Sequence, residues 1–378
     1  MNIKDFRSGR WLTAYKYKYF LPEKINHSFV WTDEAVDELL EAASLKLGEL
    51  NSFARFIPDA DMFIKMYIYK EAVVSSKIEG TQTNMEEAFS DETEIQPERK
   101  DDWREVNNYV QAMNYAIEAL KTIPLSNRLI CKAHKLLLSS VRGEHKQPGE
   151  FRKSQNWIGG ATLKDAVFVP PVHTEVPDLM SDLERFLHNE DIKTPHLIRI
   201  ALAHSQFETI HPFLDGNGRT GRLLITLYLI SKGILEKPLL YISDFFDKHR
   251  QLYYDNLNIC REKNALAQWI KFFLVAVVET SDKSCNALKN IIDYKNTVEK
   301  EKILTLGKRI KSGLTLFHYL FSKPVIQVKD VEKAVSLSPK AANDLIQQFV
   351  KLGILKEITG YQRNRVFVFD DYIRAFEG

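Results

Sequence analysis

The feature that most restricts the fold of this chain is the run H-P-F-L-D-G-N-G-R-T-G-R, which extends from His211 to Arg222. Gly216 and Gly218 tolerate positive φ, so the backbone between them is expected to curl and to point successive N–H groups at one place. After Arg219 the apolar residues recur at helical spacings of one, three and four. The run therefore predicts a curled loop on a helix N-terminus, where unpaired N–H groups and the helix dipole attract anions.

The charged side chains of this run predict a phosphate and metal site. Arg219 and Arg222 are three residues apart, so both are expected to project from one side of the first helical turn. Two guanidiniums beside a group of amides suit a di- or triphosphate better than a carboxylate. Asp215 would repel that phosphate unless a divalent cation stood between them, and Mg²⁺ prefers one or two carboxylates with phosphate oxygens. His211, with an ordinary pKa of about 6.5, can accept a proton from a hydroxyl.

A simpler interpretation is a solvated Asp-Gly-Asn-Gly turn between two helices with a buried histidine, but such a turn does not need this combination of groups. The complete run resembles the signature of the Fic (Fido) family, whose members typically transfer AMP from ATP to a protein side-chain hydroxyl. No position departs from that signature. The resemblance implies that His211 is the general base and that Asp215 binds Mg²⁺. It implies phosphate contacts from five residues: Gly216, Asn217 and Gly218 in the nest, Arg219 at the α- and β-phosphates, and Arg222 at the γ-phosphate.

A second signal lies upstream, where a helical stretch from Asp61 to Lys77 leads to Gly80, a natural helix stop. Glu79 is an acid in the last turn, where the helix dipole disfavours it, so a cationic partner is expected. The alternative is a merely exposed glutamate. The spacing of Ser75, Glu79 and Gly80 resembles the inhibitory helix of Fic proteins. That resemblance implies that Glu79, supported by Ser75, pairs with Arg222 and prevents productive binding of the ATP γ-phosphate.

Two further segments are expected to border the site. Residues 156–160 and 167–171 predict two short strands of a hairpin, which the two prolines 170 and 171 end. The hairpin resembles the flap of Fic proteins, and its edge could pair with an extended target peptide; most such hairpins are only structural. Tyr254 and Leu257 share a helix face, and the resemblance assigns them to the adenine pocket. Without it, such a pair is more typical of a core.

The chain of 378 residues suggests two or three domains. We expect an N-terminal helical region with the inhibitory helix (1–95), a Fic-type catalytic core (96–285), and a linker helix with a C-terminal domain (286–378). The fold is expected to be mainly α, with a small β-hairpin flap. No apolar run approaches the roughly 20 residues that span a bilayer. The N-terminal residues lack the apolar core of a signal peptide and the three cysteines are scattered, so we expect a cytoplasmic protein without a zinc site.

The C-terminal part is basic, with 13 Lys and Arg against 8 Asp and Glu from residue 301 to the end. A charged linker helix is expected at 282–311, and further helices at 314–321, at 328–335 and from Ser338-Pro339 to Leu352. A hairpin of residues 354–358 and 365–369 follows, with Gln362 in its turn. This order resembles a winged helix, which binds DNA or serves as a docking or dimer module. The third helix offers a thin set of polar contacts: Lys340, Asn343, Gln347, Gln348 and Lys351.

Several functions therefore stay open at this point. The first is an AMP transferase that acts on Ser, Thr or Tyr hydroxyls of a protein. The second is a regulator that senses ATP or binds DNA, with a possible homodimer. The third is removal of AMP from modified proteins at the same site.

Overall fold

The structure is a computed structural model that describes residues 2–14, 16–56, 60–139, 143, 145–361 and 364–376. It is mainly helical, as predicted. The α-helices are α1 (Glu34–Phe56), α2 (Ala60–Ile78), α3 (Met85–Phe89), α4 (Lys100–Ala119), α5 (Asn127–Leu137), α6 (Val176–His188), α7 (His196–Ile210), α8 (Asn217–Ser231), α9 (Ser243–Lys248), α10 (Arg250–Lys263), α11 (Leu266–Glu301), α12 (Ile310–Ser322), α13 (Val328–Val335), α14 (Pro339–Lys351) and α15 (Asp370–Arg374). Short 3-10 helices are η1 (Ile3–Asp5), η2 (Glu92–Glu94), η3 (Pro97–Arg99), η4 (His173–Glu175) and η5 (Ile303–Arg309). The strands are β1 (Gly9–Thr13), β2 (Lys18–Pro22), β3 (Val325–Gln327), β4 (Lys356–Glu357) and β5 (Val366–Val368).

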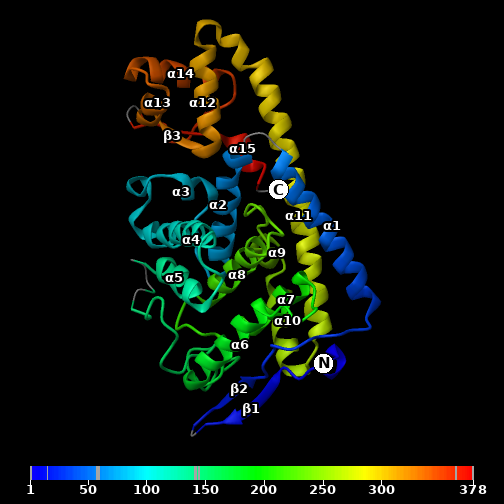
Figure 1. Cartoon of the computed structure of the whole chain (residues 1–378). Helices are drawn as coiled ribbons and strands as arrows, with labels where there is room; N and C mark the ends of the chain where they lie inside the picture. The colour runs from blue at the N-terminus through cyan, green and yellow to red at the C-terminus, as the bar shows by residue number, and fades with distance from the viewer. Residues whose placement is uncertain are drawn as a thin grey trace.

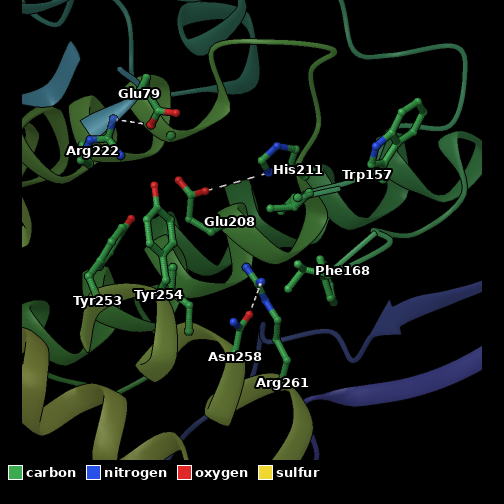
Figure 2. A pocket seen from close by; sticks show the side chains of 15 residues that line it. Glu79, Trp157, Phe168, Glu208, His211, Arg222, Tyr253, Tyr254, Asn258 and Arg261 are labelled. Atoms are coloured by element: carbon green, nitrogen blue, oxygen red, sulfur yellow. Dashed lines mark hydrogen bonds and ion pairs between the residues drawn. The ribbon is translucent and has the colours of Figure 1, made fainter. Parts of the chain in front are cut away.

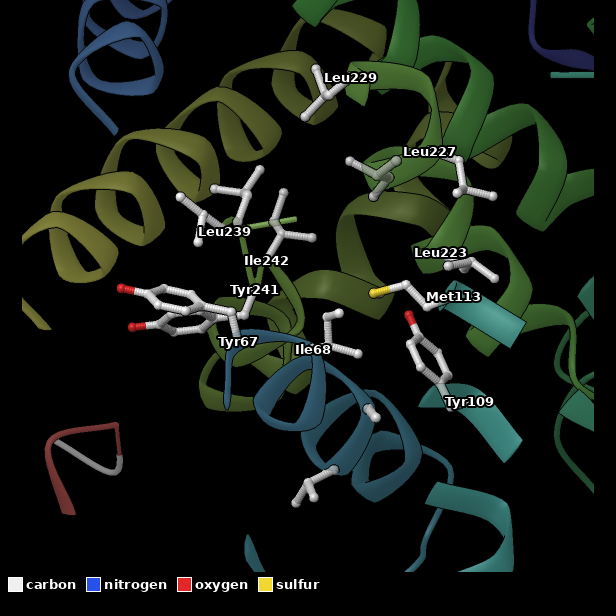
Figure 3. Packing of buried hydrophobic residues seen from close by; sticks show 14 of the residues in the cluster. Tyr67, Ile68, Tyr109, Met113, Leu223, Leu227, Leu229, Leu239, Tyr241 and Ile242 are labelled. Carbon is white, nitrogen blue, oxygen red and sulfur yellow. The ribbon is translucent and has the colours of Figure 1, made fainter. Parts of the chain in front are cut away.

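Helix α8 lies at the centre of the core, because nearly all of its residues are buried, the charged Arg219 and Arg222 among them. Figure 3 shows its Leu223 and Leu227 near Tyr109 and Met113 of α4, with α2 below them. The long helix α11 runs along one side of the molecule with α1 packed beside it (Figure 1). The helix that follows the predicted phosphate loop is therefore fixed on several sides.

The N-terminal region is not wholly helical, which corrects the prediction for residues 1–95. Strands β1 and β2 pair antiparallel, from Gly9 opposite Pro22 to Thr13 opposite Lys18. Gly9 permits this close pairing, because a Cβ there would lie 2.3 Å from the carbonyl oxygen of Leu21. The β1–β2 hairpin also contacts the predicted flap, since the Phe20 N–H donates to the Val169 carbonyl at 2.9 Å.

The predicted linker helix at 282–311 has the wrong bounds. Helix α11 begins at Leu266 and ends at Glu301, so it crosses the expected boundary between residues 285 and 286. Its first half continues the core because Trp269 and Phe273 are fully buried. The helical backbone is interrupted between α11 and α12 at Gly307, which has φ 57° and ψ −122°.

The C-terminal elements follow the expected order, with two additions. The bounds of α13 agree with the prediction, and α14 is capped by Ser338, whose side chain accepts from the Ala341 N–H. Strands β4 and β5 pair antiparallel, while β3 joins β5 on its other side and α15 follows. Gln362 of the expected turn lies outside the described residues. The likeness to a winged helix stays a prediction.

The C-terminal elements pack against the first half of α2. The rings of Phe63 on α2 and Phe321 on α12 meet edge to face, with centroids 5.2 Å apart. Tyr67 on α2 meets Phe376 in the same way at 4.9 Å, and its hydroxyl donates to the Ser284 carbonyl of α11.

Among the described helices, we find none with a long enough apolar stretch to span a membrane.

Candidate active site

His211 caps the C-terminus of α7 in a left-handed conformation, with φ 50°. A non-glycine residue keeps such a conformation only where its surroundings hold it. The Arg152 guanidinium donates to the His211 carbonyl at 2.9 Å, and the Asn156 amide donates to the same oxygen at 3.2 Å. Burial, together with Arg261 and Arg152, lowers the pKa of His211 to about 3. The imidazole is therefore a neutral base near pH 7.

The loop after His211 is closed by Asn217, the first residue of α8. Its side chain accepts from the Phe213 N–H at 2.8 Å and donates to the Phe213 carbonyl at 2.9 Å. The ring of His134 stacks on Phe213, and its Nε2 lies 2.9 Å from the Asp215 carbonyl. Gly216 has φ +72°, as expected. Because the Asn217 side chain is hydrogen-bonded to the main chain of Phe213, only the backbone of Asn217 can contribute to a phosphate nest.

Gly218 corrects the prediction, because it does not take positive φ. Helix α8 begins at Asn217, earlier than expected, and Gly218 lies within its first turn. A Cβ at Gly218 would lie 2.2 Å from Glu79 Oε1 and 2.9 Å from Arg222 Nη1. The glycine is therefore needed for space and not for backbone freedom.

Arg222 is hydrogen-bonded to residues at the C-terminal end of α2. Its Nη2 donates to Glu79 Oε1 at 2.7 Å and to the Ser75 carbonyl at 2.8 Å, and its Nε donates to Ser75 Oγ at 2.9 Å. The Arg222 side chain is 1% exposed, whereas that of Glu79 is 34% exposed. Burial raises the pKa of Glu79, but the charges of Arg222 and Arg219 outweigh this effect and hold the pKa below its usual value. Figure 2 shows this pair at one end of a cleft.

Arg219 has a carboxylate partner that the sequence did not predict. Its Nη1 lies 2.9 Å from Glu105 Oε2 on α4, and its Nη2 lies 3.7 Å from Asp215 Oδ1. The sequence carried no signal for Glu105, which reads as an ordinary helical glutamate.

Asp215 is the residue to test as a magnesium ligand. Its side chain is 42% exposed, and its Oδ1 accepts from the Gly216 N–H at 2.6 Å. Within the part of the chain that the structure describes, no three His, Cys, Asp or Glu side chains group as a metal site. A single accessible carboxylate beside the predicted phosphate site nevertheless fits Mg²⁺, which takes its remaining ligands from phosphate and water.

The cleft has a volume of about 410 Å³ and joins His211, Gly218 and Arg222 to the predicted flap and adenine residues, whereas Asp215 and Arg219 do not line it. Its lining consists of Glu79, Trp157, Ile158, Gly159, Val167, Phe168, Glu208, His211, Gly218, Arg222, Tyr253, Tyr254, Leu257, Asn258 and Arg261. The flap is less regular than predicted. Only Ile158 and Phe168 form an antiparallel bridge, because positive φ at Gly159 begins the turn at once and Pro170 cannot donate to a ladder.

Two segments of the chain match domains of one protein family. Residues 38–118 match the N-terminal domain of the Fic/DOC family, and residues 124–229 match the Fic/DOC family domain itself. The chain belongs to the Fic family. The second match includes the whole run from His211 to Arg222, and the first includes Ser75 and Glu79.

Curated relatives carry the name protein adenylyltransferase Fic. The protein from Aedes aegypti is 29% identical over 262 residues, which are 66% of this chain and 49% of that protein. The protein from Drosophila erecta is 31% identical over 184 residues, which are 48% of this chain and 34% of that protein. This Fic chain thus spans between a third and a half of the length of these relatives. A Fic family protein from Desulfovibrio desulfuricans G20 shares the fold, with a TM-score of 0.56 and 19% identity over 89% of this chain and 96% of its own.

Two cleft residues of this Fic protein were missed by the sequence interpretation. Glu208 precedes the signature by one helical turn, and burial raises its pKa to about 7 although Arg222 opposes the shift. Arg261, for which the sequence indicated no role, donates to Thr209 Oγ1 at 3.0 Å and covers the ring of Phe168 at 4.2 Å. The only sequence signal for Glu208 was its position three residues before His211.

Proposed function

We propose that this Fic protein transfers AMP from ATP to a Ser, Thr or Tyr hydroxyl of a protein and that Glu79 keeps it inactive. The observation that carries the proposal is one cleft that contains a neutral imidazole, a buried guanidinium and a helix N-terminus. The names of the curated relatives support the same reaction.

In this reaction His211 accepts the proton of the target hydroxyl, and the hydroxyl oxygen attacks the α-phosphorus. The bond from the α-phosphorus to the bridging oxygen breaks, and pyrophosphate leaves with the electron pair. The N–H groups at the start of α8 and the Arg219 guanidinium stabilise the growing negative charge. Asp215 would hold Mg²⁺, which neutralises phosphate charge when bound. Tyr254 and Leu257 would border the adenine, since both line the cleft.

Autoinhibition follows from competition for Arg222. The guanidinium assigned to the γ-phosphate already donates to Glu79 and Ser75, so ATP must displace the carboxylate to bind fully. Glu79 follows the last residue of α2 and is partly exposed. Its displacement therefore does not require α2 to unfold.

The decisive test uses Glu79→Gly with ATP labelled with ³²P at either the α- or the γ-position. We expect protein labelling from the α-label alone, little labelling by the wild-type chain, and a loss of roughly 10²- to 10⁴-fold in Glu79→Gly/His211→Ala. Labelling from the γ-position would indicate phosphoryl transfer and contradict the proposal. Binding of ATP without any label would favour an ATP-sensing regulator.

Removal of AMP from modified proteins is the second candidate, because the Glu79 carboxylate lies in the same cleft as His211 and could orient a water molecule. If this activity dominates, the wild-type chain will release AMP from a modified protein and Glu79→Gly will not. The reverse order of rates would eliminate this candidate.

A homodimer, a DNA partner and a cytoplasmic location stay predictions. The structure weakens the case for DNA on α14, because Asn343 accepts from Arg365 and side-chain atoms of Gln347 and Gln348 are buried. Lys340 and Lys351 remain for phosphate contacts. A mobility shift of duplex DNA by the full chain at low salt would support DNA binding, and its absence would end that proposal.

A further inference from the structure

Glu208 and His211 face each other across one turn of α7 with polar atoms that are not yet paired. Glu208 Oε2 lies 4.0 Å from His211 Nδ1, as the dashed line in Figure 2 marks. Among the described residues, Glu208 Oε1 and His211 Nδ1 are buried atoms without a side-chain hydrogen-bond partner, although the main-chain carbonyl of Glu208 lies near the His211 ring. A buried polar atom without a partner costs free energy, so this arrangement needs an explanation.

Helix α8 leaves room for the Glu208 carboxyl. A Cβ at Gly221 would lie 2.2 Å from Glu208 Oε1 and 3.1 Å from the ring of Phe207. Any larger residue at this position would push the carboxyl away from its site. The last glycine of the signature run therefore makes space for a group that the sequence interpretation did not include.

We propose that Glu208 is a positioning residue for His211, whose Nδ1–H donates to the Glu208 carboxylate in the active state. This inference rests on the proposed function. A separation of 4.0 Å is too long for a hydrogen bond, but bonds to catalytic groups are often long before substrate binds and shorten in the complex. A small rotation of either side chain would close the gap.

The chemistry of imidazole shows why such a partner matters. A neutral ring carries one proton, and only when this proton is on Nδ1 is Nε2 free to act as the base. During transfer the hydroxyl proton moves to Nε2, the oxygen–phosphorus bond forms, and the bridging bond breaks with its electrons going to pyrophosphate. The Nδ1 proton stays on the imidazolium, whose charge the Glu208 carboxylate stabilises.

The charges around this pair link it to autoinhibition. Arg261 and Arg152 lower the pKa of His211, whereas Glu79 raises it. Glu79 also raises the pKa of Glu208, while Arg222 and Arg261 lower it. Removal of Glu79 from the cleft therefore favours the ionised Glu208 that the proposal requires.

A competing orienting group is present in the same residue, because the main-chain carbonyl of Glu208 also interacts with the His211 ring. Side-chain substitutions separate the two, since they leave this carbonyl in place. Glu208→Gln keeps the shape and an acceptor oxygen but loses the charge, whereas Glu208→Ala loses both. Ser205→Ala, one turn earlier on α7, is a matched control at another buried polar position.

The first measurement is ¹⁵N NMR of the histidine rings in the full chain carrying Glu79→Gly, without ATP. We expect His211 to hold its proton on Nδ1, to keep most of this state in Glu208→Gln, and to shift toward the Nε2–H form in Glu208→Ala. An unchanged His211 spectrum in Glu208→Ala would overturn the proposal and leave orientation to the main-chain carbonyl. This result does not depend on AMP transfer, so it is distinct from a failure of the proposed function.

The second measurement is kcat for AMP transfer against pH in the same background. Glu208→Ala should lower kcat by roughly 10- to 100-fold, the usual effect of a misplaced catalytic group, with little change in KM for ATP. The acid limb of the profile should move to lower pH in both variants, because the carboxylate that favours imidazolium is gone. A change in KM alone, with kcat and the acid limb unchanged, would contradict the proposal. If Glu208→Ala fails to fold, the shift of the acid limb in Glu208→Gln tests the proposal instead.

Discussion

Arg219 Nη1 lies 2.9 Å from Glu105 Oε2, and both side chains are almost fully buried between α8 and α4. A buried pair of this kind is destabilising to break, because the remaining charge stays in a poorly solvated place. The Glu105 contact thus ties the phosphate-binding helix to the neighbouring helix. It also fixes the direction of a guanidinium that is proposed to hold ATP.

We predict that Glu105→Ala lowers the free energy of unfolding by about 3–5 kcal/mol, the usual cost of removing one partner of a buried pair. Urea denaturation would measure this loss. Asp101→Ala removes an exposed contact to Arg104 on the same helix and should cost less than about 1 kcal/mol. Equal effects of the two substitutions would show that burial of the Arg219 pair has no energetic importance.

Much of this site could be predicted from sequence because its central groups are local. The run from His211 to Arg222 is continuous, so one loop and one helix start set the positions of its residues. Glu105 was not predictable, because nothing in α4 distinguishes it before the fold brings it to Arg219. The roles of Gly218 and Gly221 were missed for a related reason. Their missing side chains matter only beside Glu79 and Glu208, which come from other turns of the structure.

The fold shows the same division between local and distant information. The cap of α14 at Ser338 follows from local residue types, and the helix begins where expected. The strands β1 and β3 depend on pairing partners elsewhere, and neither was predicted. The end of α11 was also misplaced, since its first half is determined by burial against the core and not by the charged pattern that suggested a linker.

Gly218→Ala should activate the chain by a steric route. The added Cβ would lie 2.2 Å from Glu79 Oε1, so the carboxylate must move away from Arg222. We expect more AMP incorporation from α-labelled ATP than in the wild type, but less than in Glu79→Gly, because the Cβ also approaches Arg222. Gly48→Ala, at a helical glycine with open space around it, should leave incorporation unchanged. A silent Gly218→Ala beside an active Glu79→Gly would contradict this mechanism.

His204 should make the protein sensitive to acid. Burial lowers its pKa to about 3, and its ring nitrogens lie 2.9 Å from the Gly221 carbonyl and the Tyr253 hydroxyl. The unfolded chain binds a proton near pH 6.5 and the folded chain does not, so stability is lost as the pH falls below about 6.5. His204→Gln removes this titration.

The difference in unfolding free energy between wild type and His204→Gln should therefore shrink by about 2 kcal/mol between pH 7 and pH 5. Denaturation at several pH values would measure it, with His173→Gln as a control at a partly exposed position. A difference that stays constant over this range would mean that His204 does not titrate as its burial implies.

The C-terminal elements should control the inhibitory helix through aromatic contacts. Phe321 meets Phe63 near the start of α2, while Glu79 and Ser75 hold Arg222 at the other end of the same helix. Phe321→Leu keeps most of the volume and should cost up to about 1.5 kcal/mol of unfolding free energy, so the fold survives. Because α2 loses its edge-to-face contact, we expect faster hydrogen exchange in residues 62–78 and more AMP incorporation than in the wild type.

The same substitution in the Glu79→Gly background separates loosening of α2 from a direct effect on the cleft. Without the Glu79 carboxylate there is no inhibition left to relieve, so Phe321→Leu should not raise incorporation further. If Phe321→Leu raises AMP incorporation in both backgrounds, Phe321 does not act through the Glu79–Arg222 pair. Unchanged exchange in α2 would show that the C-terminal elements do not hold the inhibitory helix.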